Sequence, residues 1–126
     1  MRYHATEFAD EPLYGLPVAV FDFETTGVNT QECRAVELSI VHLNLGKDNT
    51  EEVYSCRFNP GIPIPEGASA VHGIYDQDVA ECKTFEESWP DIRKHLEGRV
   101  LAAYHLSFDW TLLNCEYLVA SNGFRS

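Results

Sequence analysis

Apolar residues along the chain form short runs separated by turn-forming residues. The run LPVAVFDFE (16–24) is rich in Val and Phe and is bounded by Pro17 and Gly27, which is typical of a central strand buried on both faces. RAVELSIVHLNL (34–45) alternates enough to form a second strand, and EEVYSCRFN (51–59) follows the turn-forming sequence GKDN. The pattern therefore predicts three strands in an antiparallel meander.

The middle of the chain changes to a helical period. Residues 60–73, PGIPIPEGASAVHG, hold three prolines and three glycines, which predicts a shaped loop and no regular element. Thr84 and Glu87 then have the spacing of a capping box, and a helix with one apolar face follows and ends at Gly98. Pro90 lies inside this helix, so we expect a kink or a later start. The apolar face consists of Phe85, Trp89, Ile92 and Leu96.

The last part of the pattern adds a strand and a helix. RVLAAYH (99–105) predicts a buried strand, and Ser107 can cap a second helix that ends near residues 122–123. The order β-β-β-α-β-α predicts an α/β fold, with three antiparallel strands and then α-β-α in one mixed sheet covered by helices. Residues 1–15 are polar and aperiodic, so we expect a flexible N-terminal arm before a single domain at 16–126.

Length and composition limit the class of protein. A chain of 126 residues fits one domain with one core. It has no apolar run near the ~20 residues of a membrane span and no apolar block at its start, so we expect a cytoplasmic protein without a membrane partner. The cysteines are widely spaced and form no C-x-x-C pair, which favours structural thiols over a zinc knuckle or a disulfide framework. They are Cys33, Cys56, Cys82 and Cys115.

The charge balance is strongly acidic. The net charge is −11, from 20 acidic against 9 basic side chains. This balance argues against a protein that holds nucleic acid through a basic surface, because phosphate contacts depend on Lys and Arg. If this domain binds nucleic acid, another group has to offset the repulsion.

Two carboxylates, Asp22 and Glu24, end the first apolar run. Residues two apart in a strand project from the same face, roughly 6–7 Å apart at the backbone. The pair is stable if one carboxyl is protonated, if basic groups lie near, or if a divalent cation lies between them. By itself a D-x-E is more typical of a solvated strand end. The apolar run before it and the TTG after it, at the carboxyl end of a strand, favour a ligand site, where oxygen ligands would select Mg²⁺ or Mn²⁺ over zinc.

A third carboxylate can join this pair. Two divalent ions ~4 Å apart can polarise a phosphodiester, generate hydroxide and stabilise the leaving oxygen, and they would also offset the acidic charge. Asp109 lies two residues after Ser107, in the first turn of the predicted second helix. By itself an Asp there is explained by the helix dipole. It lies at the same sheet edge as Asp22 if the first and last predicted strands are parallel neighbours.

Three segments together resemble the DEDD superfamily of 3′→5′ exonucleases, which includes proofreading subunits, ribonuclease T and oligoribonuclease. VAVFDFETTG (18–27) is similar to the first motif, D-x-E followed by T-T-G. NPGIPIPEGASAVHGIYDQDV (59–79) is similar to the family's N-P-x-x-x-I-P loop with H-G-I and an acid, and VLAAYHLSFDWTLL (100–113) to its second motif, H-N-x-x-F-D. The resemblance covers about residues 17–118 and implies the DnaQ-like, ribonuclease H-like fold.

The resemblance implies a metal-dependent enzyme that hydrolyses phosphodiester bonds at the 3′ end of single-stranded DNA or RNA and releases nucleoside monophosphates, with a polymerase as a possible partner. By position, Asp22 would bridge two Mg²⁺ or Mn²⁺ ions, Glu24 would hold the one that activates water, and Asp109 would serve the second, mostly through water. The residues that would contact the terminal nucleotide are Thr25, Thr26, Gly27, His72 and Phe108. By itself, His72 is more typical of a loop residue that makes hydrogen bonds.

The chain departs from the family pattern in two ways. His105 stands where the family usually has Asn, and Tyr104 where it often has His. Neither form of the third motif, H-x-x-x-x-D or Y-x-x-x-D, occurs in the 126 residues. We therefore expect a domain of the histidine branch that lacks its last strand and helix, with activity reduced by several orders of magnitude because a general base and a fourth carboxylate are missing.

Alternatives to the exonuclease follow from the same residues. One is a catalytically silent exonuclease-like domain that binds nucleic acid or a partner protein. A weaker one is a phosphomonoesterase with Asp22 as its nucleophile. Glu37 is an acid inside the second predicted strand, where it either faces the metal site or lies at a polar edge. Because solvated strand faces are common, the edge is favoured.

Overall fold

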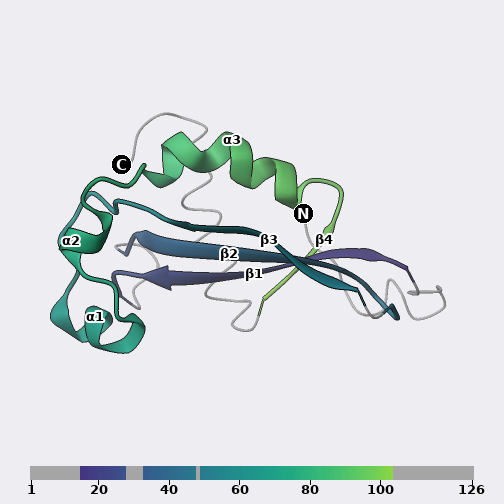
Figure 1. Cartoon of the computed structure of the whole chain (residues 1–126), viewed down its shortest axis with the longest axis horizontal. Helices are drawn as coiled ribbons and strands as arrows, with labels where there is room; N and C mark the ends of the chain where they lie inside the picture. The colour runs from purple at the N-terminus through teal and green to yellow at the C-terminus, as the bar shows by residue number, and fades with distance from the viewer. Residues whose placement is uncertain (1–14, 28–32, 48, 104–126) are drawn as a thin grey trace.

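The computed structural model describes residues 15–27, 33–47 and 49–103. Four strands form one sheet in the order β3-β2-β1-β4 (Figure 1). β2 runs antiparallel to β1 and β3, and β4 runs parallel to β1. The strands are β1 (Pro17–Thr25), β2 (Ala35–Asn44), β3 (Thr50–Arg57) and β4 (Val100–Ala102). The predicted meander, the mixed sheet and the parallel pairing of the first and last strands are confirmed.

Three helices, not one, lie between β3 and β4. They are α1 (Glu66–His72), α2 (Asp76–Val79) and α3 (Phe85–Leu96). The prediction that residues 60–73 form only a loop is therefore wrong. The last proline of this segment, Pro65, takes the position before the first turn of α1, where a proline leaves the helix hydrogen bonds intact. Gly73 ends the helix in the left-handed conformation, with φ of 75°, and its N–H donates to the carbonyl of Ser69.

α3 begins and ends on side-chain hydrogen bonds. The Thr84 hydroxyl accepts the Glu87 N–H at 3.2 Å, and the Glu87 carboxylate accepts the Thr84 N–H at 2.9 Å, which is the predicted capping box. The helix begins at Phe85 and continues through Pro90, so the expected later start is not found. At the other end, His42 Nε2 of β2 donates to the carbonyl of His95 at 2.7 Å and satisfies one of the last-turn acceptors.

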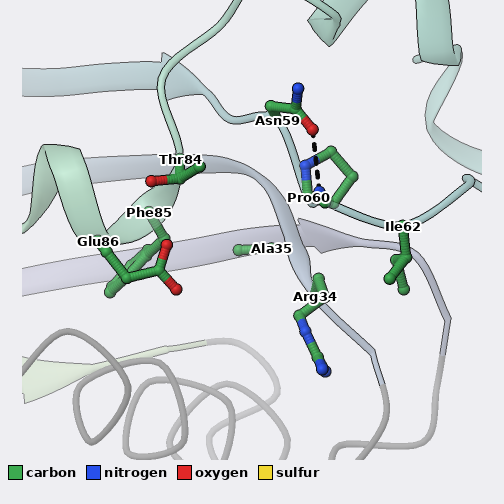
Figure 2. Close-up of a pocket in the computed structure, with 9 residues that line it drawn as sticks. Arg34, Ala35, Asn59, Pro60, Ile62, Thr84, Phe85 and Glu86 are labelled. Carbon is green, nitrogen blue, oxygen red and sulfur yellow. Dashed lines mark hydrogen bonds between the residues drawn. The ribbon is translucent and has the colours of Figure 1, made fainter. Parts of the chain in front are cut away.

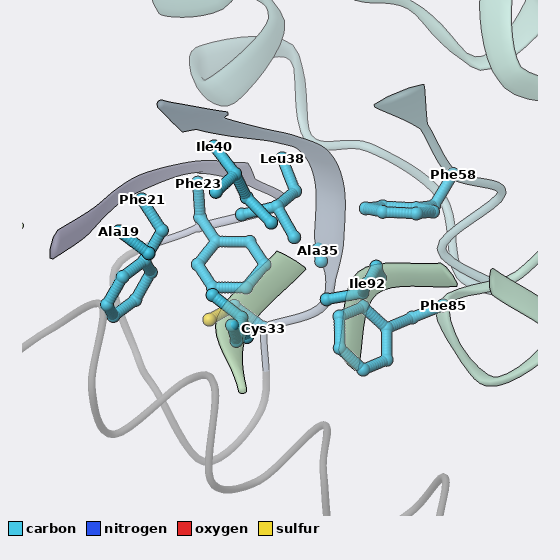
Figure 3. Close-up of a cluster of buried hydrophobic side chains, with 11 residues drawn as sticks. Ala19, Phe21, Phe23, Cys33, Ala35, Leu38, Ile40, Phe58, Phe85 and Ile92 are labelled. Atoms are coloured by element: carbon cyan, nitrogen blue, oxygen red, sulfur yellow. The ribbon is translucent and has the colours of Figure 1, made fainter. Parts of the chain in front are cut away.

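The main core lies between α3 and one face of the sheet (Figure 3). Phe21 and Phe23 of β1 point into it, and the Phe23 ring lies 6.3 Å from the ring of Phe85. Side chains alternate along a strand, so Asp22 and Glu24 project from the opposite face. On that face Asp22 is exposed and Glu24 is half-buried. The prediction of a strand buried on both faces is therefore wrong for this end of β1.

A second, smaller core fixes α1 and α2 beside the carboxyl end of β1. It packs residues of these helices and of the preceding loop against β2. Its members are Val36, Ile64, Ile74 and Val79. Three cysteines lie in the described ranges, Cys33, Cys56 and Cys82, and no disulfide joins them to one another, while Cys115 lies outside those ranges. Within the same ranges no helix is both long and apolar enough to cross a bilayer.

Candidate active site

The turn after β1 is built by two buried threonines. The Thr25 hydroxyl donates to the carbonyl of Gly27 and accepts the Gly27 N–H at 3.3 Å. The Thr26 hydroxyl accepts the N–H of Arg34 at 3.0 Å, while the Thr26 N–H donates to the Arg34 carbonyl at 3.0 Å. The T-T-G sequence therefore fixes the strand end on which Asp22 and Glu24 are carried, and both hydroxyls are engaged within the protein.

His72 connects α1 to this turn. Its Nε2 donates to the carbonyl of Thr25 at 2.9 Å, and its Nδ1 accepts the N–H of Ile74 at 3.1 Å. Since a carbonyl can only accept and an N–H can only donate, the imidazole is the neutral tautomer with its hydrogen on Nε2. His72 thus makes two hydrogen bonds within the protein, at the end of α1, and the same side chain also lines the groove described next.

A groove of about 710 Å³ lies between the end of β1 and α1. This volume is within the ~300–1,000 Å³ of typical small-molecule sites. Glu24 and the T-T-G turn form one wall. The other wall is mainly apolar and includes Val71, whose side chain is 84% exposed at the rim. The residues of this second wall are Pro65, Gly67, Ala68, Val71 and His72. An apolar wall facing a carboxylate can hold a ligand with one flat apolar part and one charged part.

A smaller hollow of about 280 Å³ lies at the start of β2, between the loop after β3 and the first turn of α3 (Figure 2). Arg34 and Glu86 are its charged lining residues. The Asn59 side chain shapes the loop by accepting the N–H of Gly61 at 2.9 Å. The hollow contains one acidic side chain and no predicted site residue, so the groove is the better candidate.

The electrostatics of the strand end centre on Glu24. Burial raises the pKa of the Glu24 carboxyl above its ordinary value, and the charge of Asp22 raises it further. His72 lowers this pKa in part, and Glu37 makes the smallest contribution, which raises it. Glu37 is the cross-strand partner of Glu24, at the end of an unbroken register that starts with Pro17 opposite Asn44. The register shifts only after this pair, between Glu24 and Thr25, and leaves Val36 as an extra residue of β2. The interpretation of Glu37 as a residue at a polar edge is therefore wrong: it lies on an inner strand, beside Glu24.

The donor set fits a hard divalent cation. Asp22 and Glu24 offer carboxylate oxygens on an accessible face, and the mutual repulsion of such a pair is what a cation between them relieves. Among the described residues, no three His, Cys, Asp or Glu side chains converge on one point. The predicted third ligand, Asp109, lies outside the described residues, as do Phe108, Tyr104 and His105.

The position of β4 bears on that third ligand. β4 is parallel to β1, so the carboxyl ends of both strands point to the same edge of the sheet. Ala102, the last residue of β4, lies level with Val20, two residues before Asp22. The structure thus meets the condition on which the placement of Asp109 at this edge depended.

The comparisons with known proteins agree with this architecture. Residues 19–122 match the Exonuclease family named after RNase T. The chain belongs to this exonuclease family. It is 36% identical over 117 residues to a DNA polymerase III subunit epsilon-like protein of Rhodobacter capsulatus, which covers 92% of this chain and 17% of that protein. It is 28% identical over 108 residues to a PolC-type DNA polymerase III of Lactococcus lactis, covering 86% of this chain and 6% of that one.

Solved structures of exonuclease I have a fold similar to that of this chain. Apo exonuclease I superposes with a TM-score of 0.73 at 15% identity, over 88% of this chain and 26% of the other. E. coli exonuclease I in complex with a dA16 oligonucleotide superposes with a TM-score of 0.72 at 16% identity, over 87% of this chain and 25% of the other. At this identity the likeness establishes the ribonuclease H-like fold. The chain spans a small part of each relative and of each of these structures.

Replacing Glu24 by Gln is expected to stabilise the metal-free chain at neutral pH. The folded-state pKa of Glu24 is raised, so its contribution to stability is present in acid and is lost as the pH rises through the folded pKa. A neutral isostere escapes that loss. Because Glu24 is only half-buried and solvent screens its charge, we expect a gain well below ~1 kcal/mol.

Thermal unfolding in EDTA at pH 7 and at about pH 4 measures this effect, since the second value lies near the ordinary pKa of Glu. The gain should be present at pH 7 and shrink at the lower pH. The matched control is Glu51→Gln. Glu51 is exposed in β3, where it is the cross-strand partner of His42. An equal gain at both pH values would contradict the assigned direction.

Proposed function

We propose that this chain is the catalytic core of a metal-dependent 3′→5′ exonuclease that acts on the 3′ ends of single-stranded DNA or RNA and releases nucleoside monophosphates. One observation carries the proposal: Asp22 and Glu24 share one face at the end of an inner strand, and Glu24 opens into a groove with an apolar second wall. Membership in the exonuclease family supports the reaction class.

The carboxylates would hold the metal. Asp22, Glu24 and Asp109 are the proposed ligands of two Mg²⁺ or Mn²⁺ ions, which when bound would supply a water of lowered pKa and charge neutralisation. Asp22 would serve both ions, Glu24 would hold the ion that activates water, and Asp109 would serve the second ion. The parallel pairing of β4 with β1 supports Asp109 as the third ligand, because Asp109 comes seven residues after Ala102, the last residue of β4.

The groove would hold the terminal nucleotide. Its apolar wall, with Val71 at the rim, suits the flat face of a base or sugar, and that contact carries no sequence information. A Cβ placed on Gly27 would meet no atom within 4 Å, so space remains beside the turn for a ligand. Thr25 and Thr26 would act through the backbone they fix, and His72 by holding α1 against the turn. Phe108 completes the proposed set.

The relatives suggest a setting for this activity. The Rhodobacter capsulatus protein is epsilon-like and the Lactococcus lactis protein is a PolC-type polymerase, so we propose a polymerase as a partner of this domain. The proposed organisation is an arm at residues 1–15 followed by the exonuclease domain at 16–126, and the proposed location is the cytoplasm.

A nuclease assay tests the proposal. In Mn²⁺, a 3′-labelled single strand is expected to release labelled mononucleotide first, while a 5′-labelled strand shortens one nucleotide at a time. Because the 126 residues lack the third motif, we expect turnover several orders of magnitude below that of a complete homologue. Release of mononucleotide from the 5′ end, or internal cleavage, would contradict the proposal. Binding of the strand in Mn²⁺ without any hydrolysis would instead identify a silent domain.

A further inference from the structure

Three charged residues form a row across the sheet at the level of the proposed metal site. Glu24 of β1 is the cross-strand partner of Glu37 in β2, and Glu37 is the partner of Arg57 in β3. The Arg57 Nε lies 3.2 Å from the Glu37 Oε2. The two side chains are 46% and 28% exposed, so this ion pair lies at the surface, on the same side as Glu24.

This order of charges is unfavourable without a cation. Like charges placed directly opposite on neighbouring strands destabilise a sheet, and Glu37 stands opposite Glu24. Arg57 partly offsets the charge of Glu37, because its Nε donates from β3 to the Glu37 carboxylate.

Glu37 is placed to act through its charge and not as a ligand. Among the described side chains, Asp22, Glu24 and Glu37 do not converge into a three-ligand group. A charge one strand away still changes the free energy of a divalent ion. In a water-like dielectric, a unit charge about 8 Å from such an ion changes its affinity by about 5-fold, and one about 11 Å away by about 3-fold.

We propose that Glu37 and Arg57 are positioning residues that set the divalent-cation affinity of Asp22 and Glu24 in opposite directions. Glu37 strengthens the binding of the cation, and Arg57 weakens it while holding Glu37 in place. This inference rests on the proposed metal site. It assigns a role to an ion pair that no step of the proposed hydrolysis uses.

Mn²⁺ titrations of the 126-residue chain, followed by the EPR signal of free Mn²⁺ at low salt, test the pair. Glu37→Gln is expected to raise the Kd about 5-fold, and Arg57→Gln to lower it about 3-fold. The double variant should lie within about 2-fold of the unsubstituted chain, because the two effects oppose each other. Arg57→Lys keeps the charge and should restore the Kd.

Two matched variants and a salt series serve as controls. Glu51→Gln removes a negative charge in β3, beyond the register shift of that strand, and Arg93→Gln removes a positive charge in α3. Both positions lie far from the row, so both variants should leave the Kd unchanged. In 0.5 M salt the shifts should shrink, since exposed charges are screened over a few ångströms. Thermal melts establish that each variant is folded.

The outcomes separate the two proposals. If the unsubstituted chain binds Mn²⁺ and both single variants shift its Kd in the same direction or not at all, the ion pair is only structural and the inference is overturned, while the metal site stands. If Glu37→Gln abolishes binding at low and high salt alike, Glu37 is a ligand, which also overturns it. If the unsubstituted chain does not bind Mn²⁺, the proposed function fails and this inference fails with it.

Discussion

Asp22→Asn is expected to weaken Mn²⁺ binding by at least about 100-fold, since loss of a residue that merely supports a ligand already costs 10–100-fold and Asp22 is the proposed bridging ligand. Any hydrolysis of a 3′-labelled strand should fall in parallel. Asn has nearly the same shape and Asp22 is exposed, so the folded structure should be unchanged. The measurement is a Mn²⁺ titration by EPR together with a thermal melt in EDTA.

The matched control for this substitution is Asp91→Asn. Asp91 is exposed on α3, on the other side of the sheet, and lies 3.6 Å from Lys94 in a surface ion pair. Removing its charge should leave both the Mn²⁺ affinity and the hydrolysis unchanged. An Asp22→Asn variant that binds Mn²⁺ as tightly as Asp91→Asn does would contradict the assignment of Asp22 as a ligand.

Ile92→Ala is expected to lower the free energy of unfolding by about 2–5 kcal/mol, the range for truncation of a fully buried Ile that leaves a cavity. Ile92 is 0% exposed and belongs to the core that holds α3 on the sheet. Urea unfolding measures the change. The exposed Val71→Ala should shift the same quantity by no more than about 0.5 kcal/mol. A loss below about 1 kcal/mol for Ile92→Ala would mean that α3 is not packed on the sheet as described.

The strands and α3 were predictable because their signals are local. Apolar runs between turn-forming residues gave β1 to β3, and the Thr84–Glu87 spacing gave the start of α3. α1 was missed because prolines and glycines suggest a loop at any position, whereas their effect depends on where they fall. Pro65 precedes the first turn and Gly73 follows the last, so both permit the helix.

The D-x-E pair was predictable for the same reason, since a period of two places Asp22 and Glu24 on one face wherever the strand lies. Glu37 was misjudged because its neighbour depends on the register between two strands. That register runs without a break from Pro17 opposite Asn44 to Glu24 opposite Glu37, and a shift of one residue would reverse which face a side chain occupies. The row of charged residues Glu24, Glu37 and Arg57 across β1, β2 and β3 can therefore be recognised only in the folded sheet.

The central claim is that the carboxylates of Asp22 and Glu24 hold a divalent cation at the end of β1. The most direct test records the amide NMR signals of the chain during a Mn²⁺ titration, because bound Mn²⁺ broadens the signals of the nearest residues first. The account predicts that substoichiometric Mn²⁺ broadens the signals of residues 22–26 and Glu37, while those of His42 and Leu43, toward the other end of β2, stay sharp. Broadening centred on Asp76 and Asp78 of α2, with residues 22–26 unaffected, would contradict it.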